Sequence, residues 1–150
     1  MRAVIQRVEK ASVVILEKEI AKIEQGILVL LGIEIKDTKE DALWLASKIA
    51  AIRIFSDEKG VMNKSIAESA GEVIVVSQFT LHAKTKKGNR PSYIKAARPD
   101  HAIPLYEQFK KDLSEAIGSQ VQSGEFGADM KVSLINDGPV TIIIDTKNKE

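Results

Sequence analysis

Apolar and polar residues alternate in short, strand-like runs over the first 35 positions. Residues 3–8, 12–16 and 27–33 are rich in β-branched side chains, and Gly26 and Gly32 punctuate them. We therefore predict three β-strands in this region.

Helical spacing of apolar residues appears twice farther along the chain. A helix over about residues 38–52 is predicted by a capping residue with an acid three positions later, in Asp37-Thr38-Lys39-Glu40. A second helix begins where Asp100 offers a cap and ends at Gly118, with Pro104 tolerated in its first turn. The apolar stripe of this second helix consists of Ile103, Tyr106, Phe109, Leu113 and Ile117.

Three further strands complete the predicted fold. Residues 72–81 begin with four consecutive apolar side chains, which is typical of a central strand covered on both faces. Strands are also predicted over residues 130–135 and 140–145, joined by residues 136–139. This order excludes regular βαβ alternation and predicts one α+β domain over residues 1–150, in which two helices pack outside a curled, barrel-like, mostly antiparallel sheet.

The composition narrows the class of protein. The chain has 150 residues, of which 44% are hydrophobic and 29% charged, as in ordinary globular domains. The absence of cysteine excludes disulfides, thiolate catalysis and Cys-ligated zinc. The N-terminal residues do not resemble a signal peptide, and no run approaches the roughly 20 apolar residues of a membrane span. We expect a soluble, cytosolic protein.

The charge is unevenly distributed although the net charge is only +1. Residues 82–99 hold six basic side chains and no acidic one, so the rest of the chain is net negative. These basic residues are Lys84, Lys86, Lys87, Arg90, Lys95 and Arg98. The segment also contains Gly88, Asn89 and Pro91, which predicts a loop. The loop either binds phosphates of a nucleic acid or is simply solvated.

Familiar catalytic and cofactor motifs are absent. His82 and His101 are the only histidines, neither has metal-ligand spacing, and we expect each at the surface or in a loop. The chain has no glycine-rich phosphate loop and no Gly-x-Ser-x-Gly motif. We expect neither a metal site nor a cofactor.

Two local features remain as places for chemistry. Ser77-Gln78-Phe79-Thr80-Leu81 ends the apolar strand with polar groups, where backbone N–H groups are free to bind a ligand. The alternative is a strand that merely leaves the core, and Thr80 as a nucleophile would need a base that the sequence does not reveal. The second feature is the segment 136–141, which is either a tight hairpin turn or part of a site. A turn explains Pro139 poorly, and the Gly138-Pro139 bond is a candidate for the cis form.

Taken together, these motifs resemble the D-aminoacyl-tRNA deacylases of the bacterial and eukaryotic type. The resemblance rests on Met1-Arg2-Ala3-Val4-Ile5-Gln6-Arg7-Val8, Ser77-Gln78-Phe79-Thr80-Leu81, Phe126-Gly127-Ala128-Asp129-Met130 and Asn136-Asp137-Gly138-Pro139-Val140-Thr141, in this order. Shorter matches are Arg53-Ile54-Phe55, Met62-Asn63 and Arg90-Pro91-Ser92. The similarity spans essentially the whole chain, and the combination of motifs is highly specific.

The resemblance implies a hydrolase that cleaves the ester bond of D-aminoacyl-tRNA, with glycyl-tRNA as a further substrate. It also implies a cytoplasmic homodimer with active sites at the subunit interface. The implied catalytic residues are Ser77, Gln78, Phe79 and Thr80, in the segment that lines the pocket for the 3′-terminal adenosine. The implied chirality and substrate-binding residues are Gly138, Pro139, Asn136, Thr141, Phe126 and Met130. The implied tRNA-binding residues are Lys84, Lys86, Lys87 and Arg90.

In this interpretation Gly138-Pro139 is a cis pair that reaches into the partner's pocket and excludes L side chains. Water attacks the ester with help from the substrate 2′-hydroxyl, backbone N–H groups stabilise the oxyanion, and Thr80 positions rather than attacks. Two other interpretations stay open: a non-catalytic module that binds the tRNA 3′ end, and an interaction protein whose motifs are only core and turns.

Overall fold

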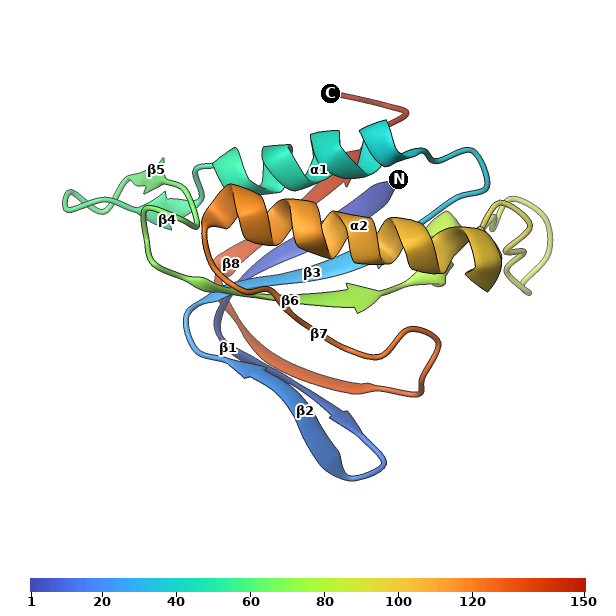
Figure 1. The fold of residues 1–150 in the computed structure, drawn as a ribbon, viewed down its shortest axis with the longest axis horizontal. Coiled ribbons are helices and arrows are strands. Elements are labelled where there is room, and N and C mark those ends of the chain that lie inside the picture. The colour runs from blue at the N-terminus through green and yellow to red at the C-terminus, as the bar shows by residue number, and fades with distance from the viewer.

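A curled sheet with two helices on one side forms the fold in the computed structural model, which describes residues 1–150 (Figure 1). In chain order the elements are β1 (Arg2–Ile15), β2 (Lys18–Ile23), β3 (Gly26–Gly32), α1 (Lys39–Ala51), β4 (Phe55–Ser56), β5 (Met62–Lys64), β6 (Glu72–Ser77), the 3₁₀ helix η1 (Phe79–His82), α2 (Pro99–Ile117), β7 (Gln122–Ser123) and β8 (Lys131–Asp145). No helix is both long enough and apolar enough to cross a lipid bilayer.

The sheet has the strand order β2-β1-β3-β6-β7, and β8 pairs with β1 as well. β1 is antiparallel to β2, β3 and β8, whereas β3–β6 and β6–β7 are parallel pairs. The sheet is therefore mixed and nearly closed into a barrel, since β1 pairs with β3 through its first half and with β2 through its second half. The predicted fold class is confirmed, and β6 is an interior strand as expected.

The first two predicted strands form a single strand, β1. Residues 3–8 and 12–16 are joined through Glu9-Lys10, whose exposed side chains interrupt the apolar pattern without interrupting the backbone pairing. The register of β1 against β8 shifts on both sides of Val8, and such bulges bend a strand. The strands β2, β4, β5 and β7 were not predicted.

The segment 136–139 is not the hairpin turn that the sequence favoured. Residues 131–145 form one long strand, β8, that pairs with β1 on both sides of this segment. The segment lies opposite the register shifts of β1 and is accommodated as an irregularity within the ladder. The two predicted C-terminal strands therefore lie end to end rather than side by side.

Both predicted helices form, with small differences at their ends. α1 begins with a capping box, but this is formed by Thr38 and Asp41, one position later than the predicted pair Asp37 and Glu40. α2 begins at Pro99 with Arg98 at the N-cap, so Asp100 lies in the first turn and is not the cap. Gly118 ends α2 in the left-handed conformation as expected. The predicted strand 72–81 stops at Ser77, and the chain then turns into η1.

Two hydrophobic clusters hold these layers together. The larger lies between the helices and the sheet and includes Ala3, Ile5 and Val29, with Phe109 and Leu113 from α2. The smaller lies inside the curl of the sheet and is formed by Val8, Ala11, Val13, Ala21, Ile23, Leu28, Ile74 and Val76. β1 contributes to both clusters because its bulge turns its later residues toward the inside of the curl. Ile103, predicted on the apolar stripe of α2, is 41% exposed and lies outside the core.

Candidate active site

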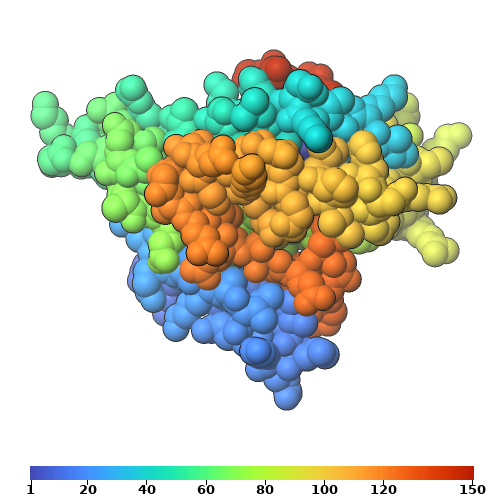
Figure 2. Space-filling view, in the orientation of Figure 1, coloured from blue at the N-terminus to red at the C-terminus, as the bar shows by residue number.

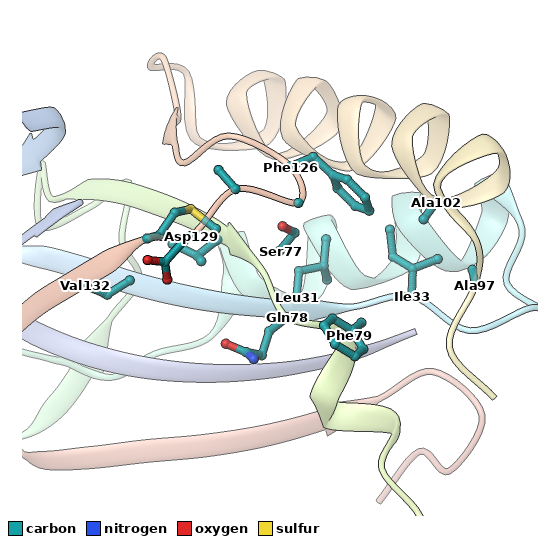
Figure 3. Close-up of a pocket in the computed structure, with 14 residues that line it drawn as sticks. Leu31, Ile33, Ser77, Gln78, Phe79, Ala97, Ala102, Phe126, Asp129 and Val132 are labelled. Carbon is teal, nitrogen blue, oxygen red and sulfur yellow. The ribbon is translucent and has the colours of Figure 1, made fainter. Parts of the chain in front are cut away.

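A cavity of about 280 Å³ opens beyond the carboxyl ends of β3 and β6 (Figure 3). Parallel strands that end at the same edge leave backbone groups free there, and ligands commonly bind at that edge. The cavity, which we call the site cavity, is bounded by Leu31 and Ile33, by the segment 76–79, by Ala97 and Ala102, and by the segment 126–130 with Val132. Most of its lining is apolar, and the Ser77 hydroxyl and the Gln78 amide are among its few polar groups.

The segment 77–80 owes its position to β3. Ser77 pairs with Leu31 in the parallel ladder, and the Gln78 N–H donates to the Leu31 carbonyl over 2.8 Å. η1 then folds directly onto Gly32, where an added Cβ would lie only 3.0 Å from the Gln78 carbonyl oxygen and from the Leu81 Cβ. A side chain at position 32 would therefore displace the residues that form one wall of the site cavity.

Hydrogen bonding at η1 leaves two backbone donors free. The Gln78 side-chain amide donates to the Thr80 hydroxyl, so these two polar side chains hold each other. The N–H groups of Phe79 and Thr80, the first two in η1, have no acceptor within the chain, as expected at the start of a helix. Free N–H groups at the rim of a cavity are suited to bind a negatively charged oxygen.

The opposite wall comes from a segment about 50 residues farther along the chain. Phe126 packs edge-to-face against Tyr106 of α2 with ring centroids 5.7 Å apart, and the Tyr106 hydroxyl donates to the Val75 carbonyl over 2.9 Å. Burial raises the pKa of Tyr106 above its usual range, so its hydroxyl stays protonated. Asp129 lies at the opening of the cavity (Figure 3) and pairs with Lys131 over 3.2 Å.

The site cavity brings together five of the residues that the sequence predicted for the site. These are Ser77, Gln78, Phe79, Phe126 and Met130. Thr80 follows directly in η1 and contacts Gln78, but it does not line the cavity.

Gly138 and Pro139 lie outside the site cavity of their own chain. Their peptide bond is cis, as the sequence suggested, and Gly138 has φ +129°. Gly138 follows Val132, a residue of the cavity wall, by six positions in β8. At about 3.3 Å per residue, the dipeptide is roughly 20 Å from that wall. Both residues are exposed, so they face solvent or another molecule.

The side chain of Asn136 spans this irregular segment. Its carbonyl oxygen accepts from the Val140 N–H over 2.9 Å, and its amide donates to the Val140 carbonyl and to the Thr141 hydroxyl over 3.3 and 3.2 Å. Asn136 and Thr141, both predicted for substrate binding, therefore also fix the backbone that presents Gly138 and Pro139.

Arg7 is a residue of this region that the sequence analysis missed. Its guanidinium lies 3.1 Å from the Asp137 carboxylate, and it donates to the backbone carbonyls of Asp137 and Ile54. The signal was available, because Arg7 shares a strand face with the apolar residues Ala3 and Ile5. A charge on a core-facing position of a strand requires a buried partner.

The predicted basic residues lie on a loop at one end of the molecule (Figure 2). Lys84 and Ser92 form a two-bond antiparallel bridge at the base of this loop, with hydrogen bonds of 2.8 and 3.0 Å. Lys84, Lys86, Lys87 and Arg90 are all exposed and none forms an ion pair. The loop begins immediately after η1, so the cations start beside the site cavity.

The prediction for His82 was wrong. This residue is 4% exposed, because the bare backbone of Gly32 allows η1 to pack its last residue inward, with the His82 Cδ2 only 3.1 Å from the position of an added Cβ. His101 is exposed as expected and contacts the Asp37 carbonyl over 3.0 Å. No group of three or more histidine or acidic side chains is arranged to hold a metal ion.

A family model and full-length relatives of known description all match this chain, and their descriptions agree with one another. The family model described as D-Tyr-tRNA(Tyr) deacylase matches residues 4–145. A D-aminoacyl-tRNA deacylase of Bacteroides fragilis (strain YCH46) is 65% identical over 150 residues, covering all of both chains. A D-aminoacyl-tRNA deacylase of Flavobacterium johnsoniae is 61% identical over the same length, again with complete coverage of both chains.

Two solved structures share the fold. One, described as a c-Myc DNA unwinding element binding protein, is 39% identical with a TM-score of 0.91, over 97% of this chain and 98% of that one. The other, described as a probable eukaryotic D-amino acid tRNA deacylase, is 18% identical with a TM-score of 0.82, over 95% and 97% of the two chains. The second likeness concerns the fold alone.

Proposed function

The chain belongs to the D-Tyr-tRNA(Tyr) deacylase family, and we propose that its site cavity is where the ester bond of D-aminoacyl-tRNA is hydrolysed. Hydrolase activity on D-aminoacyl-tRNA follows from full-length relatives at 65% and 61% identity. The assignment to this cavity is supported by one observation above all: Ser77, Gln78 and Phe79 meet Phe126 and Met130 across it. Aminoacyl-tRNA is found in the cytoplasm, and we propose that the protein acts there.

The terminal adenosine of the tRNA is the part of the substrate that the site cavity accommodates. Its volume of about 280 Å³ is just below the range of ligand pockets, which run from roughly 300 to 1,000 Å³. Its apolar walls suit a flat base, while the polar groups of Ser77 and Gln78 face the sugar and the ester. The amino-acid side chain then points outward, which predicts tolerance for many D-amino acids and activity on glycyl-tRNA.

Hydrolysis proceeds by attack of water on the ester carbonyl, assisted by the neighbouring 2′-hydroxyl of the substrate. The attack creates a negatively charged oxygen, and the free N–H groups of Phe79 and Thr80 are the donors that we assign to it. One such donor typically contributes on the order of 10²-fold to 10³-fold in rate. The products are the free D-amino acid and the tRNA.

Thr80 acts as a positioning residue in this mechanism. Its hydroxyl accepts a hydrogen bond from Gln78 and forms none with a histidine or carboxylate, which would be needed to activate it as a nucleophile. We expect Thr80→Ser to keep most of the activity and Thr80→Ala to lower it without abolishing it. An ester trapped on Thr80 would contradict this assignment.

Selection for one enantiomer is the role we assign to Gly138 and Pro139 of a second subunit. A pocket that only favours apolar side chains cannot separate mirror images, since rejection requires a rigid group beside the α-carbon. The dipeptide is exposed and roughly 20 Å from the site cavity of its own chain, so it reaches a site cavity only in a homodimer. Its backbone is fixed by the Val140 N–H, which donates to the Asn136 side chain, and by Arg7, which donates to the Asp137 carbonyl.

A non-catalytic module that binds the tRNA 3′ end would use the same cavity and the same basic loop. Incubation of the purified protein with D-Tyr-tRNA and with L-Tyr-tRNA separates the two functions. Release of D-tyrosine with little release of L-tyrosine is the expected result. Retention of both tRNAs without release would identify a binding module, and no interaction with either would leave only a structural role.

A further inference from the structure

A second cavity lies beside the site cavity and carries an unusual concentration of positive charge. Its volume is about 320 Å³, and it is lined by Glu34, Ile35, Lys36, Lys84, Ile94 and Lys95. We call it the lysine cavity. None of its three lysines forms an ion pair, so their charges are available to a ligand.

The two cavities share one piece of backbone. Glu34 and Ala96 form an isolated antiparallel bridge, with hydrogen bonds from the Ala97 N–H to Ile33 and from the Ile35 N–H to Lys95. Ile33 and Ala97 line the site cavity, whereas Ile35 and Lys95 line the lysine cavity. Two residues of extended chain span roughly 7 Å, which is comparable to the length of one nucleotide.

Exposed aromatic and aliphatic side chains lie on the surface between the site cavity and the lysine cavity. Phe79, at the wall of the site cavity, packs edge-to-face against Tyr93 with centroids 4.9 Å apart. Phe79 is 55% and Ile94 is 70% exposed. An exposed aromatic platform next to unpaired cations is the combination with which proteins hold single-stranded nucleic acid, since bases stack on the rings while cations follow the phosphates.

We propose that the lysine cavity binds the phosphates of the single-stranded 3′ end of tRNA that immediately precede the terminal adenosine. This inference rests on the proposed function, because it takes the site cavity as the place of that adenosine. Lys36 and Lys95 then join Lys84 in contacting the RNA, and Tyr93 and Ile94 contact its bases.

Glu34 provides an internal test, since it is the one acidic group in the lysine cavity. Its carboxylate is directed inward, 3.7 Å from His82 and only 18% exposed, so the lining keeps a net positive charge. Removing the carboxylate with Glu34→Gln should strengthen binding of RNA, which is the opposite effect to removal of a lysine.

The experiment compares two substrates that share the terminal adenosine ester, of which only the tRNA ester carries the preceding nucleotides with their phosphates. Hydrolysis of D-tyrosine esterified to tRNA and of D-tyrosine esterified to adenosine is measured with the parent protein, with Lys36→Ala/Lys95→Ala and with Glu34→Gln. Lys18→Ala/Lys59→Ala is the matched control, because both lysines are exposed and unpaired but lie on the hairpins β1–β2 and β4–β5, away from the basic loop (Figure 1).

We expect Lys36→Ala/Lys95→Ala to raise KM for the tRNA ester on the order of tenfold with little change in kcat, and to leave the adenosine ester unaffected. The dependence of log affinity for tRNA on log salt should become shallower by about 0.7 for each lysine removed. An unchanged KM for the tRNA ester, or an equal loss on the adenosine ester, would overturn the proposal. If the parent protein hydrolysed neither ester, the proposed function would fail, whereas a shallower salt dependence of tRNA retention on a filter would still support the lysine cavity.

Discussion

The guanidinium of Arg7 lies 3.1 Å from the carboxylate of Asp137, which joins the middle of β1 to the residue directly before Gly138. The same guanidinium donates to the Asp137 carbonyl over 3.2 Å and to the carbonyl of Ile54. Arg7 is only 9% exposed. Because guanidinium donors have a fixed geometry, Arg7 helps to determine where the exposed dipeptide lies relative to the sheet, together with the hydrogen bonds of Asn136.

Arg7→Lys should therefore impair selectivity more than the fold. An ammonium group keeps the charge, but its donors all come from one nitrogen, whereas Arg7 reaches Asp137 through Nε and the Ile54 carbonyl through Nη1. We expect the lost contact to cost about 1–3 kcal/mol of stability. The ratio of the deacylation rates of D-Tyr-tRNA and L-Tyr-tRNA should fall markedly. Arg2→Lys is the matched control, since Arg2 also joins β1 to an aspartate of β8, Asp145, but far from Gly138. An equal fall in the rate ratio for both variants would contradict a specific role of Arg7.

Gly138→Ala tests the dipeptide itself. Its φ of +129° is a conformation open almost only to glycine, and an added Cβ would lie 2.8 Å from the Val140 Cγ2 and 3.1 Å from the Arg7 guanidinium. We expect loss of D-selective deacylation together with about 1–3 kcal/mol of stability. Gly60→Ala has a positive φ of +75° but no atom within 4 Å of its added Cβ. This control should lose a comparable or smaller amount of stability and keep its selectivity.

Local periodicity predicted both long helices and the strands β1, β3, β6 and β8, because their buried faces repeat along short windows of the chain. It failed where the tertiary structure overrides the local pattern. Glu9-Lys10 separates two predicted strands but lies at the bulge of one continuous strand, and the segment 136–139 joins two predicted strands but is flanked on both sides by pairing with β1. A curl in a sheet exposes residues in mid-strand, and the amino-acid pattern of such a curl is that of a loop.

The residues of the site likewise fall into those that local sequence predicted and those that it did not. Residue chemistry alone indicated the polar strand end at Ser77 and the basic loop, whereas only the resemblance connected Ser77 with Phe126, from a segment about 50 residues later. The local sequence pattern does not predict which distant segments contact each other across a sheet. The burial of His82 likewise depends on Gly32, which belongs to another strand.

Asp41→Asn should destabilise the protein in a pH-dependent way. Burial raises the pKa of Asp41, but hydrogen bonds from Lys147 and from the Thr38 N–H lower it more, to about 2. The folded pKa is below the ordinary value, so the ionised carboxylate stabilises the fold above about pH 4, and this contribution is lost as pH falls toward 2.

Since Lys147 is 41% exposed, solvent screens the pair, and the contribution at neutral pH should be only about 1 kcal/mol. Urea unfolding of the parent and of Asp41→Asn at a series of pH values measures it. The difference in the free energy of unfolding between the two proteins should become small near pH 2. A difference that does not depend on pH would show that the charge of Asp41 is not its cause.

The ring of His82 is buried, and substitutions can test what this burial costs in stability. Its Nε2 has no hydrogen-bond partner, and its Nδ1 is 3.7 Å from the Glu34 carboxylate, beyond hydrogen-bond distance. An unsatisfied buried polar atom costs about 1–3 kcal/mol, so replacing the ring by an apolar side chain removes that cost along with some packing. The free energy of unfolding of His82→Leu should therefore lie within about 1 kcal/mol of that of the parent. His82→Ala should lose at least about 2 kcal/mol, because it leaves a cavity under η1. Urea unfolding at neutral pH measures both, and an equal loss in the two variants would mean that the ring nitrogens bind a buried water molecule, which Leu cannot replace.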